Sequence, residues 1–97
     1  MGLLDKLFGG KGGGAGVSVE DGVSELAALY DDPEVKAEGG ISMTAPRAEE
    51  VRAIGRKLHK AGGKASMEAA RDRLRERYSW AGANLEAIWA SLPEWRD

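Results

Sequence analysis

The sequence predicts a small all-α protein, and three observations lead to this prediction. Apolar side chains recur at helical spacings of three and four, as they do at Val51, Ile54 and Leu58. Residues that start or stop helices flank these stretches, with Ser, Thr or Pro before them and Gly or Pro after them. The β-branched residues are scattered, and no run alternates apolar and polar side chains with a period of two. We therefore expect a small bundle of three main helices.

The chain has 97 residues, which is enough for one hydrophobic core and too few for two. We expect residues 18–97 to form a single all-α domain, with helices at about 18–30, 45–61 and 65–78 and a last helix at about 84–92. A core of this size leaves only modest net stability. A protein partner or a second copy of the chain is therefore expected to bind it.

The first helix of the domain is expected over residues 18–30. Ser18 supplies an N-cap oxygen, and Glu20 and Asp21 lie near the positive end of the helix dipole. Residues 31–33, Asp-Asp-Pro, stop or restart the helix. Few large apolar side chains follow, so residues 34–43 are expected to form a loop with one helical turn. The apolar stripe of this helix consists of Val19, Val23, Leu26 and Tyr30.

The strongest helical pattern begins at Thr44, which we interpret as a cap residue followed by Pro46 in the first turn. Gly62 and Gly63 end this helix, and Ser66 is the expected cap of the next one. Because the connection is so short, the helices at 45–61 and 65–78 should form a central antiparallel αα-hairpin. The buried positions are expected at Val51, Ile54, Leu58, Ala61, Met67, Ala70, Leu74 and Tyr78.

The last helix is expected at 84–92, because residues 80–83 break the helical pattern and Pro93 stops it. Its apolar positions are Leu85, Ile88, Trp89 and Leu92. Trp89 is expected in the core, whereas Trp80 and Trp95 are expected to close the ends of the hairpin, since burying such rings gives a small core its area. If Trp95 were exposed, it would be a candidate interface residue.

Residues 51–97 resemble a group of small bacterial helical proteins. The resemblance rests on Ile54-Gly55, Leu58 and Gly62-Gly63, which match an IGxxLxxxGG pattern, and on the later Leu85-Glu86 and Trp89, which match LExxW. The sequence departs from the group at residues 90–94, where a Gly-rich turn is usual. That group has no assigned activity, so the resemblance implies a shared helical fold and nothing about chemistry.

Residues 1–8 form a separate amphipathic segment, with Leu3, Leu4, Leu7 and Phe8 on one side of a two-turn helix and Lys6 on the other. Residues 9–17 are mostly glycine and form a flexible linker, whose first eight residues span roughly 16 Å. The apolar side of this short helix is expected to bind an anionic membrane surface or a protein groove. Because this short helix is tethered, we expect it to act as a mobile segment rather than as part of the hydrophobic core.

The net charge of −2 conceals an asymmetry between the two halves of the chain. Residues 1–46 carry three basic and eight acidic side chains, whereas residues 47–97 carry eleven basic and eight acidic ones. The two halves could attract each other, or the basic surface of residues 47–80 could bind nucleic acid or an acidic partner. The sequence pI near 5.4 disfavours nucleic acid. The candidate residues of this surface are Arg52, Arg56, Lys60, Arg71 and Arg75.

No pattern of residues predicts catalysis. The chain lacks cysteine, and its single histidine, His59, cannot supply a typical zinc site alone, so we expect no metal and no cofactor. The glycines around Lys11 lack the strand, the Ser or Thr, and the helix of a phosphate-binding loop. No serine lies in a nucleophile-elbow context. The absence of cysteine, of a signal peptide and of a membrane span favours the cytoplasm, with peripheral membrane association left open.

Two functional hypotheses follow from the sequence. The first is a non-enzymatic adaptor or scaffold that presents the tethered residues 1–8 to a membrane surface or a partner protein groove. The alternative is a small nucleic-acid-binding module that uses the basic face of residues 47–80.

Overall fold

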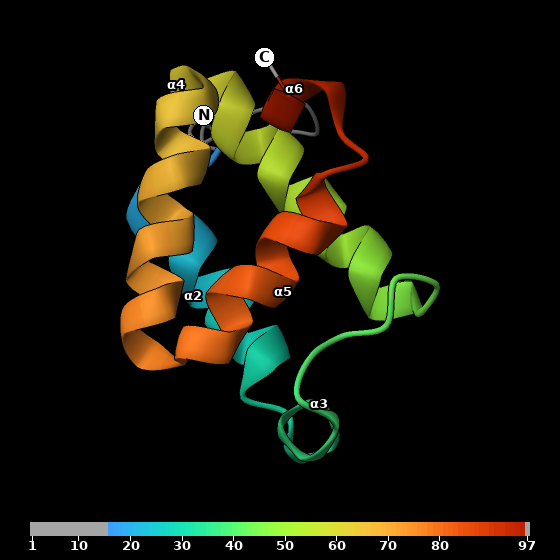
Figure 1. Ribbon diagram of the computed structural model, residues 1–97. Helices are drawn as coiled ribbons and strands as arrows, with labels where there is room; N and C mark the ends of the chain where they lie inside the picture. The colour runs from blue at the N-terminus through green and yellow to red at the C-terminus, as the bar shows by residue number, and fades with distance from the viewer. Residues whose placement is uncertain (1–15, 97) are drawn as a thin grey trace, which may run out of the picture.

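A computed structural model describes residues 16–96, and every regular element in this part of the chain is a helix. The helices are α2 (Val19–Tyr30), α3 (Pro33–Glu38), α4 (Pro46–Arg77), α5 (Ser79–Trp89) and α6 (Pro93–Arg96). Figure 1 shows α2 and α5 beside the two arms of α4, with α3 at the opposite end of the bundle from α6. The predicted small all-α bundle is confirmed.

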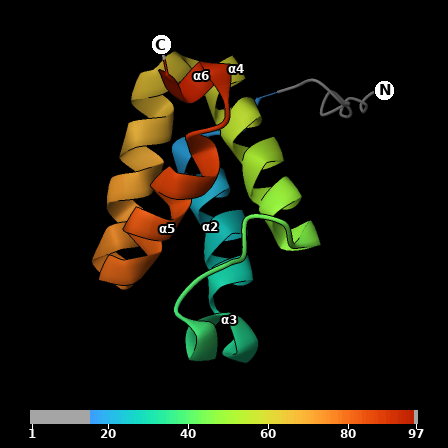
Figure 2. The same ribbon diagram turned by 45° about the vertical axis from the view of Figure 1, so that its right-hand side comes forward.

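The predicted αα-hairpin forms the centre of the fold, because α4 reverses direction at Gly62 and Gly63. Gly63 has φ 74° and ψ −166°, a backbone conformation that is essentially restricted to glycine. The hairpin thus has a first arm of residues 46–61 and a second arm of residues 64–77, which Figure 2 shows on either side of α2. We call the end of the bundle where α4 reverses, residues 56–64, the hairpin tip.

Two of the predicted helix starts are wrong. Ala45, not Thr44, is the N-cap residue of the first arm, and it makes no side-chain cap hydrogen bond. Pro46 begins the arm instead, because its fixed φ suits the first helical position. The second arm is helical from the residue after Gly63, so Ser66 lies inside the helix rather than at its start. The two glycines alone make the turn between the arms.

Helix α2 forms as predicted and packs closely on the first arm. The Ser18 hydroxyl accepts a hydrogen bond of 3.1 Å from the backbone N–H of Asp21 and so caps the helix. Leu26 is fully buried. A Cβ atom at Gly22 would lie 2.7 Å from Cδ2 of Leu58, so the absence of a side chain lets the two helices approach. Sequence periodicity therefore placed the correct face of α2 inward.

The segment that joins α2 to α4 contains the expected helical turn, which is α3. The Asp32 carboxylate caps α3 by accepting a hydrogen bond from the N–H of Glu34. Asn84 of α5 fixes the loop that follows, since it accepts from the N–H of Ile41 and donates to the carbonyl of the same residue. The hydroxyl of Tyr30 donates to Asn84 Oδ1 at 2.7 Å. Burial raises the pKa of Tyr30, so this donor stays protonated.

The last part of the chain differs from the prediction at both ends of the helix. α5 begins at Ser79, so the break expected over residues 80–83 is absent, and α5 ends at Trp89 rather than near residue 92. Ala81 and Gly82 supply the buried positions of its first turn, and such small residues give a weak apolar signal. Pro93 begins α6 instead of stopping a helix, again as a proline at the first helical position.

The core contains Trp89, as predicted, with none of its side chain exposed. Its indole Nε1 donates a 2.9 Å hydrogen bond to the carbonyl of Val51 in the first arm. Trp80, in the first turn of α5, is half-buried against the rings of Tyr30 and Tyr78. The fully buried large side chains come from α2, α4 and α5. They are Leu26, Tyr30, Val51, Leu58, Met67, Leu74, Leu85, Ile88 and Trp89.

Candidate functional site

The predicted amphipathic segment, with Leu3, Leu4, Lys6, Leu7 and Phe8, lies outside the described residues, and so does most of the linker. The structure does describe where the chain joins the folded domain. The backbone N–H of Val17 donates a 3.3 Å hydrogen bond to the carbonyl of Lys57. A Cβ atom at Gly16 would lie 2.7 Å from Cβ of Ala61, so Gly16 lies directly against the end of the first arm. The chain therefore enters the domain at the hairpin tip.

Three of the five residues predicted to form a basic face are engaged within the domain. The Arg52 guanidinium forms an ion pair with Glu49 and donates to the carbonyl of Met43 and the hydroxyl of Ser91. Only 16% of its side chain is exposed. Arg52 therefore joins the first arm to the loop before it and to the residues after α5.

Arg71 and Arg75 both reach toward α5, and the side chain of Arg75 remains half exposed. Both donate to the same carboxylate oxygen of Glu86, at 2.8 and 3.2 Å respectively. Arg71 also pairs with Asp72 at 2.9 Å, and Arg75 lies 3.9 Å from the same carboxylate. These two carboxylates neutralise the second arm where it faces α5. The sequence could not predict this pairing, because Glu86 lies in a different helix.

Arg56 and Lys60, the remaining two predicted residues, are exposed and form no ion pair within residues 16–96. Lys57, which the sequence analysis did not select, is exposed in the same two turns and is likewise without an ion pair in this range. Lys57 stands one residue after Arg56 and three before Lys60, a helical spacing that could have identified it. We call Arg56, Lys57 and Lys60 the tip cations.

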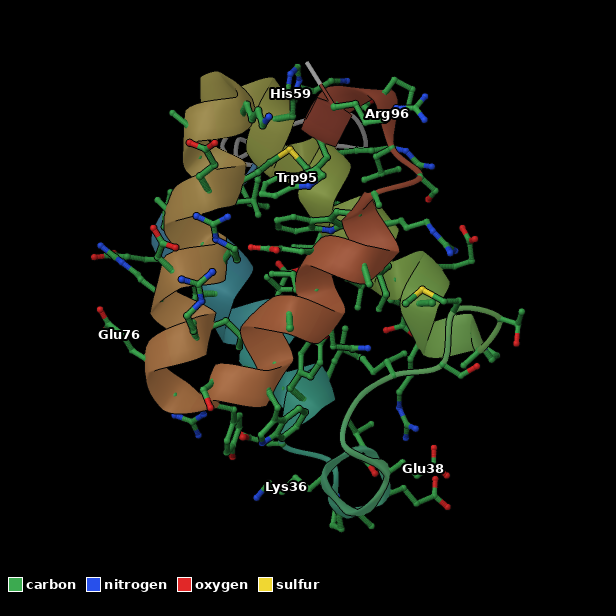
Figure 3. All side chains as sticks on the ribbon, in the orientation of Figure 1. Lys36, Glu38, His59, Glu76, Trp95 and Arg96 are labelled. Carbon is green, nitrogen blue, oxygen red and sulfur yellow. The ribbon has the colours of Figure 1, made fainter. Side chains whose placement is uncertain are left out.

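Trp95 is half-buried and packs on the core rather than standing free. Its ring centroid lies 5.4 Å from that of Trp89. Two cations lie over the same ring, with Nζ of Lys64 5.3 Å and Cζ of Arg71 5.6 Å from its centroid. Figure 3 places Trp95 at the hairpin end of the bundle, near His59 and Arg96. The predicted role of Trp95 in closing one end of the hairpin agrees with this packing.

The domain exposes little apolar surface. Met43, at 41% exposure, is the single large apolar side chain in residues 16–96 that ranks as exposed. In the same range, no helix has both the length and the apolar character needed to cross a bilayer. No group of three or more His, Asp and Glu side chains lies close enough together there to hold a metal ion. The notable surface of the described chain is thus charged rather than apolar.

No protein-family profile matches the chain, and neither does any curated protein or solved structure. The resemblance of residues 51–97 to small bacterial helical proteins stays a prediction. The hairpin tip is the candidate functional site, because the tip cations and the entry point of the chain share the last two turns of the first arm.

Proposed function

We propose that the protein is a non-enzymatic adaptor or scaffold whose helical domain holds residues 1–8 on a glycine-rich tether and presents their apolar side chains to an external surface. That surface is a membrane or the groove of a partner protein, which includes a second copy of the chain. The setting we propose is the cytoplasm.

The observation that supports this proposal best is how little apolar surface the described part of the domain exposes. Residues 1–8 carry four large apolar side chains, and burying them would stabilise a complex by about 6–10 kcal/mol at usual transfer values, before the cost of ordering the tail. In residues 16–96, one large apolar side chain, Met43, ranks as exposed, which is a small area to set against four such side chains. This favours an external partner, rather than their own domain, for the apolar side chains of residues 1–8.

The internal pairing of the arginines favours the adaptor over the nucleic-acid alternative. Phosphate binding requires cations that can exchange their counterions for the nucleic acid backbone. Arg52, Arg71 and Arg75 are already paired with carboxylates. A phosphate would have to displace Glu49 and Glu86 before it could bind these residues.

A nitroxide label at residue 5 tests whether residues 1–8 bind their own domain. The chain has no cysteine, so Asp5→Cys gives a single labelling site and leaves all four apolar side chains in place. In dilute full-length protein, we expect broadening of backbone amide signals to be strongest near Gly16 and Ala61 and to decline with distance from the hairpin tip. The same sample with its nitroxide reduced is the control. Strong broadening centred on another patch, such as the surroundings of Met43, would show intramolecular docking and contradict the proposal.

A further inference from the structure

Resting on the proposed function, we infer that the external surface is an anionic lipid bilayer, and that the tip cations Arg56, Lys57 and Lys60 contact its head groups while residues 1–8 insert their apolar side chains. The tip cations and the tether then act as two parts of one membrane contact.

The charge of the tip cations is available for an external partner. All three side chains are exposed, and none is paired with a carboxylate in residues 16–96. The same helix pairs Arg52 with Glu49, and it pairs Arg71 and Arg75 with Asp72 and Glu86. Arg56 and Lys60 stand four residues apart, a spacing at which like charges repel each other across one helical turn. An anionic surface would relieve this repulsion.

The chain enters the domain beside these cations. Val17 bonds to the carbonyl of Lys57 itself, and Gly16 lies against Ala61, one residue beyond Lys60. From the sequence, we expect the eight glycine-rich residues before Val17 to reach roughly 16 Å. The amphipathic segment is therefore held within reach of any planar surface that the tip cations touch. Lys6 and Lys11 add two basic residues to this stretch.

Each part alone is too weak for stable membrane binding. A two-turn apolar segment gains little once the cost of ordering it is subtracted, and stable anchoring of peripheral proteins generally needs two signals, such as an apolar group and a basic patch. The domain supplies the second signal through three cations, each of which strengthens binding to an anionic surface about fivefold. A protein groove would account for the apolar segment but leave the tip cations without a role.

Vesicle flotation of the full chain tests this inference. The probes are vesicles of phosphatidylcholine with phosphatidylglycerol, compared with vesicles of phosphatidylcholine alone, at low salt. We expect the protein to float with the anionic vesicles and much less with the neutral ones. The double variant Arg56→Gln with Lys60→Gln should reduce binding about 25-fold, at about fivefold for each cation. Added salt should weaken binding, since the Debye length falls to about 8 Å at physiological ionic strength.

A matched control removes the same charge elsewhere. Lys36→Gln with Arg73→Gln also eliminates two exposed cations, and Figure 3 shows Lys36 at the opposite end of the bundle from His59. This variant should retain binding to anionic vesicles within about twofold, whereas Leu4→Ser with Leu7→Ser should abolish it. Circular dichroism confirms that each variant remains helical.

Two outcomes would overturn the inference. Equal losses in the tip variant and its control would show that net charge, not the tip cations, governs binding. No flotation of the unmodified chain would exclude the bilayer, while the proposed adaptor function would stand if the nitroxide at residue 5 still shows residues 1–8 free of their own domain. Intramolecular docking in that labelling experiment would instead refute the proposed function itself.

Discussion

At the scale of single residues, the contact between Gly55 and Trp89 sets how closely α5 approaches the first arm. A Cβ atom at position 55 would lie 2.6 Å from Nε1 of Trp89. That same nitrogen donates to the carbonyl of Val51. The sequence identified Trp89 as a core residue from its spacing, but the glycine beneath it gave no local signal. Its importance follows only from the packing of two helices.

Gly55→Ala is therefore expected to destabilise the protein. The added methyl group would displace a buried indole, which typically costs about 1–3 kcal/mol, against a gain of up to about 1 kcal/mol in helix propensity. Chemical denaturation of the variant should show a net loss of free energy of unfolding of about 1–2 kcal/mol. A Trp89→Phe background removes the clashing nitrogen and should reduce this loss by about 1 kcal/mol. Fully additive effects in the double mutant would contradict the packing explanation.

At the scale of elements, helix starts and stops were predictable where the signal is local. Ser18 caps α2, Asp32 caps α3, and Gly62 and Gly63 turn the hairpin, each through atoms within a few residues. The bounds of α5 were not predictable. Its start depends on the buried Ala81 and on rings that meet only after folding. The tip cations were partly predictable, since exposure on a helix follows from spacing but ion pairing between helices does not.

The end of α2 is joined to the end of the second arm by an electrostatic contact at Asp31. Its carboxylate accepts from the guanidinium of Arg77 at 2.9 Å and from the hydroxyl of Tyr78 at 2.6 Å. Hydrogen bonds from Arg77 and then from Tyr78 lower the pKa of Asp31 below its ordinary value. The ionised carboxylate is therefore favoured in the folded state.

This contact predicts a pH dependence of stability on the acid side. Because the folded pKa of Asp31 is lowered, its contribution is present above the unfolded value of about 3.9 and is lost as the pH falls through the folded pKa. Asp31→Asn should lower stability at neutral pH and flatten the decline below about pH 4. Urea denaturation at a series of pH values measures this decline. Glu25→Gln, at an exposed position, is the control and should leave the curve unchanged. An unaltered acid decline in Asp31→Asn would refute the assigned contact.

At the scale of the whole molecule, the acidic first half and the basic second half do contact each other. Arg47 binds Asp32 at 2.7 Å, and Arg77 binds Asp31 at 2.9 Å. The charge asymmetry of the sequence left such attraction as one of two alternatives, and it could not assign the pairs. Once these and the pairs within the second half are formed, the tip cations remain exposed where the chain enters the domain. The tip cations and the entry point of the chain therefore lie at the same end of the domain.

The most direct test of this account is the electron paramagnetic resonance line shape of the full chain with a nitroxide on Asp5→Cys. In dilute protein we expect sharp lines, because the described part of the domain offers residues 1–8 little exposed apolar surface to bind. Vesicles that contain phosphatidylglycerol should broaden the lines, and vesicles of phosphatidylcholine alone should not. Broad lines before any vesicle is added would contradict the central claim that the domain presents this segment outward.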